Sequence, residues 1–301
     1  MSAWYDAHEI LFQTTAIYIV LALSFQVVLR SGVFSFLSVG FFGAGGYMVA
    51  DLVDHGFPGV GSMLAATGAA AVVGYAMSLP LVRLRGLYLG MVTFAIDQIV
   101  IVVADNGGSV TGGTVGIFGI PLVVSTGELW IIAGICVLVV SQLERRSHGR
   151  AIEVLRVDEM LARSIGVQVR KERNMIFALS AALGSLAGAM HTLTFSTIST
   201  TGFGFGLIVT GLTMAVVGGI VSWVGAVIGA IIVAWFPQVF SFVGGYRTIV
   251  YGVLVVLVMA YEPNGIVGLV QRAWRRFRGE RRRQLALLDV PDAGDRPAVA
   301  S

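Results

Sequence analysis

Charged side chains gather in one polar stretch, residues 144–173, which separates two groups of long apolar runs. From Arg150 to Ile165 this stretch has the pattern of an amphipathic helix, and Gly166 is expected to end it. Its apolar stripe consists of Val154, Val157, Leu161 and Ile165, and its charged stripe of Arg156, Glu159 and Arg163. Such a helix can lie on a lipid surface or dock into a groove of a partner protein. Both interpretations stay open at this point.

The residue types needed for catalysis or metal binding do not cluster. A phosphate-binding loop requires Gly-Lys-Ser/Thr, yet the sole lysine, Lys171, stands between Arg170 and Glu172. His8, His55 and His148 fall in separate predicted loops, and one cysteine, Cys136, allows neither a disulfide within the chain nor a cysteine-based metal site. The sequence therefore predicts no catalytic residue, no bound metal or cofactor, and no ATP hydrolysis by this chain.

Asp97 is the one carboxylate well inside an apolar run. Counted from Leu87 it lies about 15 Å along a helix, near the centre of a bilayer. A charge there costs at least about 2.5 kcal/mol, so we expect the side chain to face the protein interior. It is predicted either to form part of a polar pathway or partner contact, or to be a hydrogen-bonded structural carboxylate.

The composition excludes a water-soluble domain. Of 301 residues, 56% are hydrophobic and 12% are charged, whereas soluble proteins carry roughly 25% charge. About 20 apolar residues span a bilayer, and nine runs approach that length. They are Ile10–Leu29, Val33–Ala50, Val60–Leu81, Leu87–Ala104, Leu129–Leu143, Met175–Leu193, Phe205–Ile220, Trp223–Phe240 and Tyr246–Tyr261. The expected fold class is an all-α polytopic membrane protein with about nine membrane segments.

The distribution of basic residues predicts the topology. Of 20 Lys and Arg, eight lie within 144–173 and eight beyond residue 263, whereas 105–128 has none. Basic segments beside apolar runs mark the cytoplasmic side, so these charges indicate a membrane protein rather than nucleic-acid binding. We expect the N-terminus outside, the C-terminus inside and no cleavable signal peptide, because no basic residue precedes the first run.

Glycines distinguish two of the runs. Val33–Ala50 contains Gly40, Gly43, Gly45 and Gly46, and Phe205–Ile220 is short and ends near a glycine pair. Both are predicted to be discontinuous helices, which transporters use near the midplane. For Gly40–Gly46 the alternative of close helix packing is equally open. Packing is the expected role of the spaced pairs Gly86/Gly90, Gly184/Gly188 and Gly225/Gly229.

Several motifs, in order, resemble a known family. They are RLRGLYL at 83–89, TGGTVGIFGIP at 111–121, RVDEMLARSIGV at 156–167, VGGIVSWVGAVIGA at 217–230 and PNGIVGL at 263–269. Together they resemble the branched-chain amino-acid ABC importer permeases of the Liv type, and the M-type subunit more closely than the H-type one. The likeness runs from about residue 32 to residue 269.

The resemblance implies a permease domain over residues 1–269 and a basic cytoplasmic tail over 270–301, expected at the anionic inner leaflet of a bacterial cytoplasmic membrane. The stretch 144–173 would form the coupling loop that an ATPase subunit grips. The implied contact residues are Arg156, Asp158, Glu159, Leu161, Ala162, Ile165 and Gly166. The implied partners are an H-type permease subunit, two cytoplasmic ABC ATPases that bind ATP and Mg²⁺, and a periplasmic substrate-binding protein.

The resemblance also implies a translocation pathway lined by Ser35, Ser38, Phe41, Tyr47, Thr93 and Asp97. The outer loop with Thr111, Gly112, Gly113 and Gly116 would receive the binding protein, although its glycines could serve turn geometry alone.

The expected function is ATP-driven import of branched-chain amino acids or a related small carboxylate or amide. Val33, Leu37 and Ser38 replace polar residues common in the family, which suggests a carboxylate with a larger apolar body. The alternative is an ion-coupled secondary transporter, but such carriers usually hold several ionisable groups in the membrane, and here Asp97 stands nearly alone.

Overall fold

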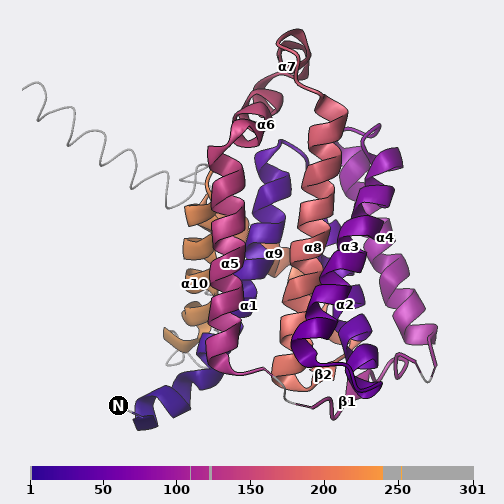
Figure 1. The fold of residues 1–301 in the computed structure, drawn as a ribbon, viewed down its shortest axis with the longest axis vertical. Coiled ribbons are helices and arrows are strands. Elements are labelled where there is room, and N and C mark those ends of the chain that lie inside the picture. The colour runs from indigo at the N-terminus through magenta and orange to yellow at the C-terminus, as the bar shows by residue number, and fades with distance from the viewer. Residues whose placement is uncertain (1, 109, 122–123, 240–251, 253–301) are drawn as a thin grey trace, which may run out of the picture.

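The computed structural model describes residues 2–108, 110–121, 124–239 and 252 (Figure 1). Eight long helices run alternately between two ends of the molecule. They are α1 (Ser2–Arg30), α2 (Leu37–Asp54), α3 (Gly59–Leu81), α4 (Gly86–Asn106), α5 (Thr126–Arg145), α8 (Val169–Phe195), α9 (Phe205–Gly218) and α10 (Trp223–Val239). The predicted run Tyr246–Tyr261, apart from Gly252, and the tail 270–301 lie outside the described residues.

The remaining elements are short and mark the two ends of the bundle (Figure 1). Helices α6 (Ser147–Val157) and α7 (Glu159–Ser164) lie at one end. At the other end β1 (Ile117–Phe118) pairs antiparallel with β2 (Thr197–Ile198), which the 3₁₀ turn η1 (Thr200–Gly202) follows. The described part of the chain is therefore all-α apart from one two-residue strand pair.

Six described segments are long and apolar enough to cross a membrane. They are His8–Arg30, Gly59–Leu81, Gly86–Asn106, Thr126–Arg145, Val169–Phe195 and Thr200–Gly218. The expectation of an all-α, multi-pass membrane protein is thus confirmed. Helix α2 and the shorter apolar α10 complete the bundle without being among these six.

Helix α8 is the centre of the packing, and it contacts α1, α2 and α3. Glycines allow its backbone to touch that of α2. A Cβ added at Gly184 or Gly188 would overlap the carbonyl oxygen of Ser38 or Phe42, and one at Gly45 would overlap Ser185. The predicted packing role of the Gly184/Gly188 pair is therefore confirmed.

Of the two interpretations left open for Gly40–Gly46, a helix break is wrong, because α2 is an uninterrupted α-helix from Leu37 to Asp54. Its glycines serve contact instead: Gly43 faces Phe203, Gly45 faces Ser185 of α8, and Gly46 faces Thr192. The non-helical part is the preceding segment 33–36. These glycines allow other segments to come close to α2, and the sequence alone does not show which segments these are.

Helix α9 is short, as predicted, with 14 residues. The irregular part of this crossing precedes it, where η1 leads to Phe203 and the N-cap residue Gly204. At its other end α9 packs tightly on α10, since a Cβ at Gly229 would overlap the carbonyl of Met214. The predicted packing role of the Gly225/Gly229 pair is thus confirmed. At Gly86 (φ +54°) no described atom lies within 4 Å of an added Cβ, so the predicted packing role of this glycine is wrong.

Candidate functional site

The polar stretch 144–173 forms two helices, and the prediction of one amphipathic helix from Arg150 to Ile165 is wrong. Helix α6 ends at Val157, and Asp158, in an extended conformation, caps α7. Its Oδ1 accepts the backbone N–H groups of Met160 at 2.7 Å and Leu161 at 3.3 Å. An aspartate at this position satisfies donors that a new helix leaves free, so the chain starts a second helix in a new direction.

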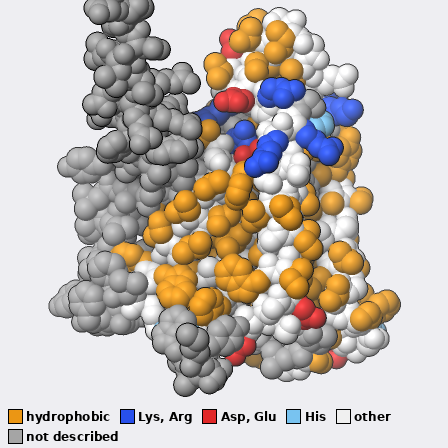
Figure 2. Space-filling view, turned by 60° about the vertical axis from the view of Figure 1, so that its left-hand side comes forward, with side chains coloured by type: hydrophobic (Ala, Val, Ile, Leu, Met, Phe, Trp, Pro, Cys, Tyr) orange, Lys and Arg blue, Asp and Glu red, His pale blue; other side chains and the backbone are white. Residues whose placement is uncertain are grey.

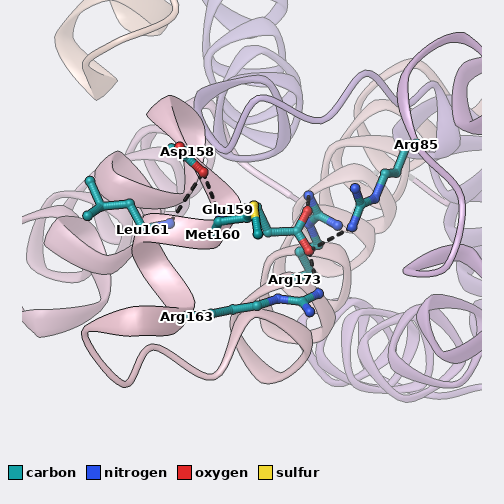
Figure 3. A network of polar contacts seen from close by, with 7 residues as sticks. All are labelled: Arg85, Asp158, Glu159, Met160, Leu161, Arg163 and Arg173. Atoms are coloured by element: carbon teal, nitrogen blue, oxygen red, sulfur yellow. Dashed lines mark hydrogen bonds and ion pairs between the residues drawn. The ribbon is translucent and has the colours of Figure 1, made fainter.

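Glu159 is the centre of a polar cluster beside this cap (Figure 3). Its carboxylate accepts from Arg163 at 2.6 Å within α7, from Arg85 at 3.1 Å and from Arg173 at 3.2 Å. Arg85 immediately precedes α4, and Arg173 lies in the first turns of α8. The cluster, which we call the Glu159 cluster, ties α7 to the ends of two long helices.

The three arginines also set the ionisation of Glu159, whose side chain is 17% exposed. Partial burial acts to raise its pKa, but the hydrogen bond from Arg163 and the charges of Arg173 and Arg85 outweigh it and lower the pKa below its ordinary value. Glu159 is therefore ionised at neutral pH, and the ion pairs are fully formed there.

Four large apolar side chains on and beside α7 are exposed, and we call them the apolar tip. They are Val157 (79% exposed), Met160 (81%), Leu161 (51%) and Ile165 (60%). In Figure 2 the apolar tip is the orange cap at the top of the molecule, above a band of blue basic side chains. The apolar tip thus lies exposed at the most polar end of the bundle.

The residues predicted for the coupling contact divide into two groups. Arg156, Asp158, Leu161, Ile165 and Gly166 are exposed around the apolar tip. Ala162 is fully buried and packs with Leu155 and Val169 in a small core of its own, and Glu159 turns toward its arginines.

Met160 is the residue that the sequence interpretation missed, because a single helix through Asp158 places it off the apolar stripe. The N-cap preference of Asp158 is the signal that could have found it.

Glu144, the penultimate residue of α5, is the centre of a second polar cluster. Its Oε1 lies 2.8 Å from Nη1 of Arg30 and accepts Nε2 of Gln26 at 2.9 Å and the backbone N–H of Trp223 at 3.1 Å. Arg30 and Gln26 belong to α1, and Trp223 begins α10. This Glu144 cluster was not predicted, and it joins three long helices directly beneath α6.

Thr93 and Asp97, both fully buried, lie on the face of α4 that packs against α2. Thr93 Oγ1 accepts the backbone N–H of Phe36 at 3.1 Å, which holds the non-helical segment 33–36 inside the bundle. Asp97 faces Gly40, where an added Cβ would lie 3.3 Å from its Oδ1. Neither Asp97 oxygen has a hydrogen-bond partner among the described residues.

The other residues predicted to line a pathway do not share one surface. Ser38 points toward α8, where its Oγ lies 2.9 Å from that of Ser180. Tyr47 packs edge-on against Phe203 at a centroid distance of 6.0 Å. Ser35 and Phe41 are buried, and Ser35 accepts the N–H of Leu37 at the start of α2. Thr93 and Asp97 lie at the contact of α4 with α2 and the segment before it.

An aromatic series that the sequence interpretation missed crosses the same region. Phe34 packs edge-on against Phe36, Phe36 against Phe94 of α4, and Phe94 against Phe205, with centroid distances of 5.0, 6.2 and 6.2 Å. Phe34 is 43% exposed and Phe205 is 65% exposed. The series therefore links the irregular starts of α2 and α9 and reaches the surface of the chain.

The loop after α4 is fixed by its own geometry. Thr111 Oγ1 donates to the Ala104 carbonyl at 2.6 Å, while Gly112, Gly113 and Gly116 adopt φ of +71°, +62° and +88°. A Cβ at Gly116 would overlap the Ile198 carbonyl of β2. Glycine is thus required for the turns at these positions. Together with Asp51, Asp54 and His55 at the C-terminal end of α2, the loop encloses a pocket of about 500 Å³.

Comparisons with known proteins decide the family. The model of the family described as branched-chain amino acid transport system / permease component matches residues 8–259. The chain belongs to this permease family. The high-affinity branched-chain amino acid transport permease LivM of Escherichia coli K12 is 29% identical over 85% of this chain and 69% of its own length.

Two further relatives carry similar names. LivM of Salmonella typhimurium LT2 is 28% identical over the same shares, and a probable LivM of Methanocaldococcus jannaschii is 24% identical over 69% of each chain. No solved structure gives a significant match. The Liv-type resemblance is thus confirmed, and the chain is a transport component rather than an enzyme. Both polar clusters, the apolar tip and Asp97 lie inside the segment matched to the permease family.

Proposed function

We propose that this permease is one transmembrane half of an ABC importer in the bacterial cytoplasmic membrane, and that it moves a branched-chain amino acid or a related small carboxylate or amide. The LivM relatives support the substrate class by their names. Energy would come from ATP hydrolysed by two separate cytoplasmic ATPase subunits, which would also bind the Mg²⁺. An ion-coupled carrier gains no support from these relatives.

The observation that carries the proposal is the apolar tip. Met160 and Leu161 stand exposed on α7, which Glu159 ties to the bundle through Arg85 and Arg173, and Val157 stands exposed at the end of α6. Helices with such a surface dock into hydrophobic grooves of partner proteins. Glu159 of α7 bonds to Arg85, just before α4, and to Arg173, near the start of α8. A movement of α7 would therefore be transmitted to α4 and α8, which both pack against α2.

The proposed topology is nine membrane segments with the N-terminus outside and the C-terminus inside. Arg30, Arg85 and residues 144–173 gather at the α6–α7 end, and a basic excess is typical of the cytoplasmic side. Eight described helices alternate between the ends, so one more crossing after α10 would return the C-terminus to that side.

The remaining partners are assigned to faces of the molecule. We place the second permease subunit, of the H type, against the face with the exposed Phe34 and Phe205, so that the aromatic series and Asp97 border a shared pathway. The periplasmic binding protein would dock at the end that carries Thr111, Gly112 and the strand pair. Alternating access would then open the pathway to one side at a time.

A binding assay with the ATPase subunits tests the apolar tip. We expect Met160→Asp and Leu161→Asp to abolish co-purification with the ATPases and transport, because a charge cannot be buried in an apolar groove without a partner. The matched control is Phe57→Asp, at a 57% exposed residue in the α2–α3 turn of the opposite end. Undiminished ATPase binding by both tip variants would contradict the proposal.

A further inference from the structure

A basic pocket lies beside α8 at the α6–α7 end and borders the Glu159 cluster through Arg163. Its volume is about 560 Å³. Its lining combines two residues of α3, one of α7 and the basic start of α8 with the residue before it, namely Tyr75, Leu79, Arg163, Gln168, Val169, Arg170, Lys171 and Asn174. Arg163 bonds to Glu159, whereas Arg170 and Lys171 are exposed and form no ion pair with another described residue.

A buried polar atom of this pocket also lacks a partner. Asn174 is 4% exposed, and its Oδ1 has no hydrogen-bond donor among the described residues. A buried acceptor without a donor costs free energy, so a bound group that donates a hydrogen bond there would be favoured. The pocket therefore combines two free positive charges with an acceptor that requires a hydroxyl or ammonium group.

The pocket continues into an apolar surface. Tyr75 and Leu79, 48% and 40% exposed, end a stripe along α3 that also contains Leu64 (69%) and Val72 (71%). Gly68 lies between them on the same stripe, and no atom comes within 4 Å of a Cβ added there. This spacing of three to four residues leaves a shallow apolar track that leads from the basic pocket toward the opposite end.

We infer that this pocket binds the headgroup of an anionic phospholipid of the phosphatidylglycerol type, with an acyl chain along the α3 stripe. Arg170 and Lys171 hold the phosphate, and Asn174 accepts a headgroup hydroxyl. Basic pockets between membrane helices on the cytoplasmic side are suited to anionic lipid. The inference rests on the proposed orientation, which places this end in the inner leaflet.

A second pocket on the other side of α8 does not have this combination. It is lined mainly by apolar residues such as Leu138, Val139 and Met175, with Arg146 and His148 at its edge. His148 Nδ1 lies 3.0 Å from Oε2 of Glu172, so this ring nitrogen already has a partner. No unpartnered buried side-chain atom of the described residues lines it. This pocket is suited to acyl chains of any lipid and does not select a particular headgroup.

Native mass spectrometry of the detergent-purified full chain tests the inference. The probes are short-chain phosphatidylglycerol, phosphatidylmethanol, which has the same charge but no headgroup hydroxyl, phosphatidylcholine and soluble glycerol 3-phosphate. Arg170 and Lys171 are expected to contribute about equally to the affinity for an anionic headgroup. R170Q/K171Q should therefore weaken phosphatidylglycerol binding about thirty-fold. The matched control is R145Q/R150Q, which removes two exposed charges of the same loop that do not line the pocket.

Asn174→Ala should abolish the preference for phosphatidylglycerol over phosphatidylmethanol while leaving anionic binding in place. Melting temperatures of all variants verify that the chain stays folded. The inference is overturned if R145Q/R150Q weakens binding as much as R170Q/K171Q, or if phosphatidylcholine binds equally well. Competition by glycerol 3-phosphate at the same concentration would also overturn it, because the site would then bind free phosphate. None of these outcomes bears on ATPase binding at the apolar tip, so the two proposals fail separately.

Discussion

The two carboxylate clusters at the α6–α7 end have similar chemistry and different surroundings. In the Glu144 cluster both charged partners are largely buried, with Glu144 16% and Arg30 13% exposed, and the groups that meet all belong to long helices. In the Glu159 cluster Arg85 and Arg163 are 70% and 62% exposed, and one partner helix, α7, has only six residues. The first cluster therefore joins the long helices to one another, and the second attaches a six-residue helix to them.

The difference indicates how force could pass through this end. Helix α6 begins right after α5 and rests on the Glu144 region, where a Cβ at Gly149 would overlap the Glu144 carbonyl. Its last turn meets the α1–α2 turn, with Arg156 3.6 Å from a Cβ built on Gly32. Beyond Asp158 the Glu159 cluster and a small core hold α7 among the described residues. The position of the tip thus depends on ion pairs of which two have exposed arginines.

Removing the buried carboxylate should have the largest effect. Glu144→Ala leaves Arg30 largely buried without its counter-ion and the Trp223 N–H without an acceptor. We expect the free energy of unfolding in mixed micelles to fall by about 3 kcal/mol. Glu144→Gln, which retains an acceptor for Trp223, should lose less. An equal loss in Glu144→Ala and Glu159→Ala would remove the distinction between the two clusters.

Glu159→Ala should separate coupling from stability. Because two of its three arginines are mostly exposed, we expect a loss of about 1 kcal/mol or less in the free energy of unfolding. Transport in the reconstituted complex should fall several-fold, while ATPase binding at the apolar tip persists. Normal transport by a folded Glu159→Ala complex would show that α7 needs no tie to α4 and α8.

Acid should remove the stabilising contribution of the Glu159 ion pairs, as Glu159→Ala does. The three arginines lower the pKa of Glu159, so the cluster's contribution is complete above its unfolded pKa of about 4.3 and is lost as pH falls through the lowered folded value. Limited proteolysis within 144–173 should therefore be slow between pH 7 and pH 5 and become faster only below pH 4. The rate in Glu159→Ala should not change over this range, and a parallel change in that variant would assign the transition to other groups.

Arg85→Gln should have the smallest effect. Its guanidinium is 70% exposed, so we expect a change of about 0.5 kcal/mol or less in stability and a modest loss of transport. The variant tests whether α4 is driven through this contact. A loss of transport as large as that of Glu159→Ala would make the α4 contact the main link, and no loss would leave Arg173 and α8 as the route.

The sequence predicted local features better than contacts between helices. The run Leu87–Ala104 coincides with α4 within two residues at each end, because a membrane helix must be continuously apolar. The glycines of α2 were ambiguous, since a glycine that breaks a helix and one that lets α8 approach look the same in one dimension. The structure shows contact at Gly45 and Gly46 and a break before Leu37.

The candidate site was predicted only in part, because its local features are visible in the sequence and its contacts between distant residues are not. Charge periodicity located the exposed loop and its apolar residues, but partners distant in sequence, such as Arg85 for Glu159, leave no local signal. The N-cap at Asp158 was present in the sequence, yet helical periodicity continued through it and favoured one helix. Asp97 was correctly expected to be buried, and its role stays a prediction.

The central claim, that the apolar tip faces the cytosol and meets the ATPases there, is tested most directly by labelling a cysteine at its most exposed residue. In a Cys136→Ser background, Met160→Cys would be exposed to a membrane-impermeant maleimide. The account predicts labelling in inverted vesicles, protection there by added ATPase subunits, and no labelling in sealed right-side-out cells. Labelling of intact cells, or labelling that the ATPases leave unchanged, would contradict it.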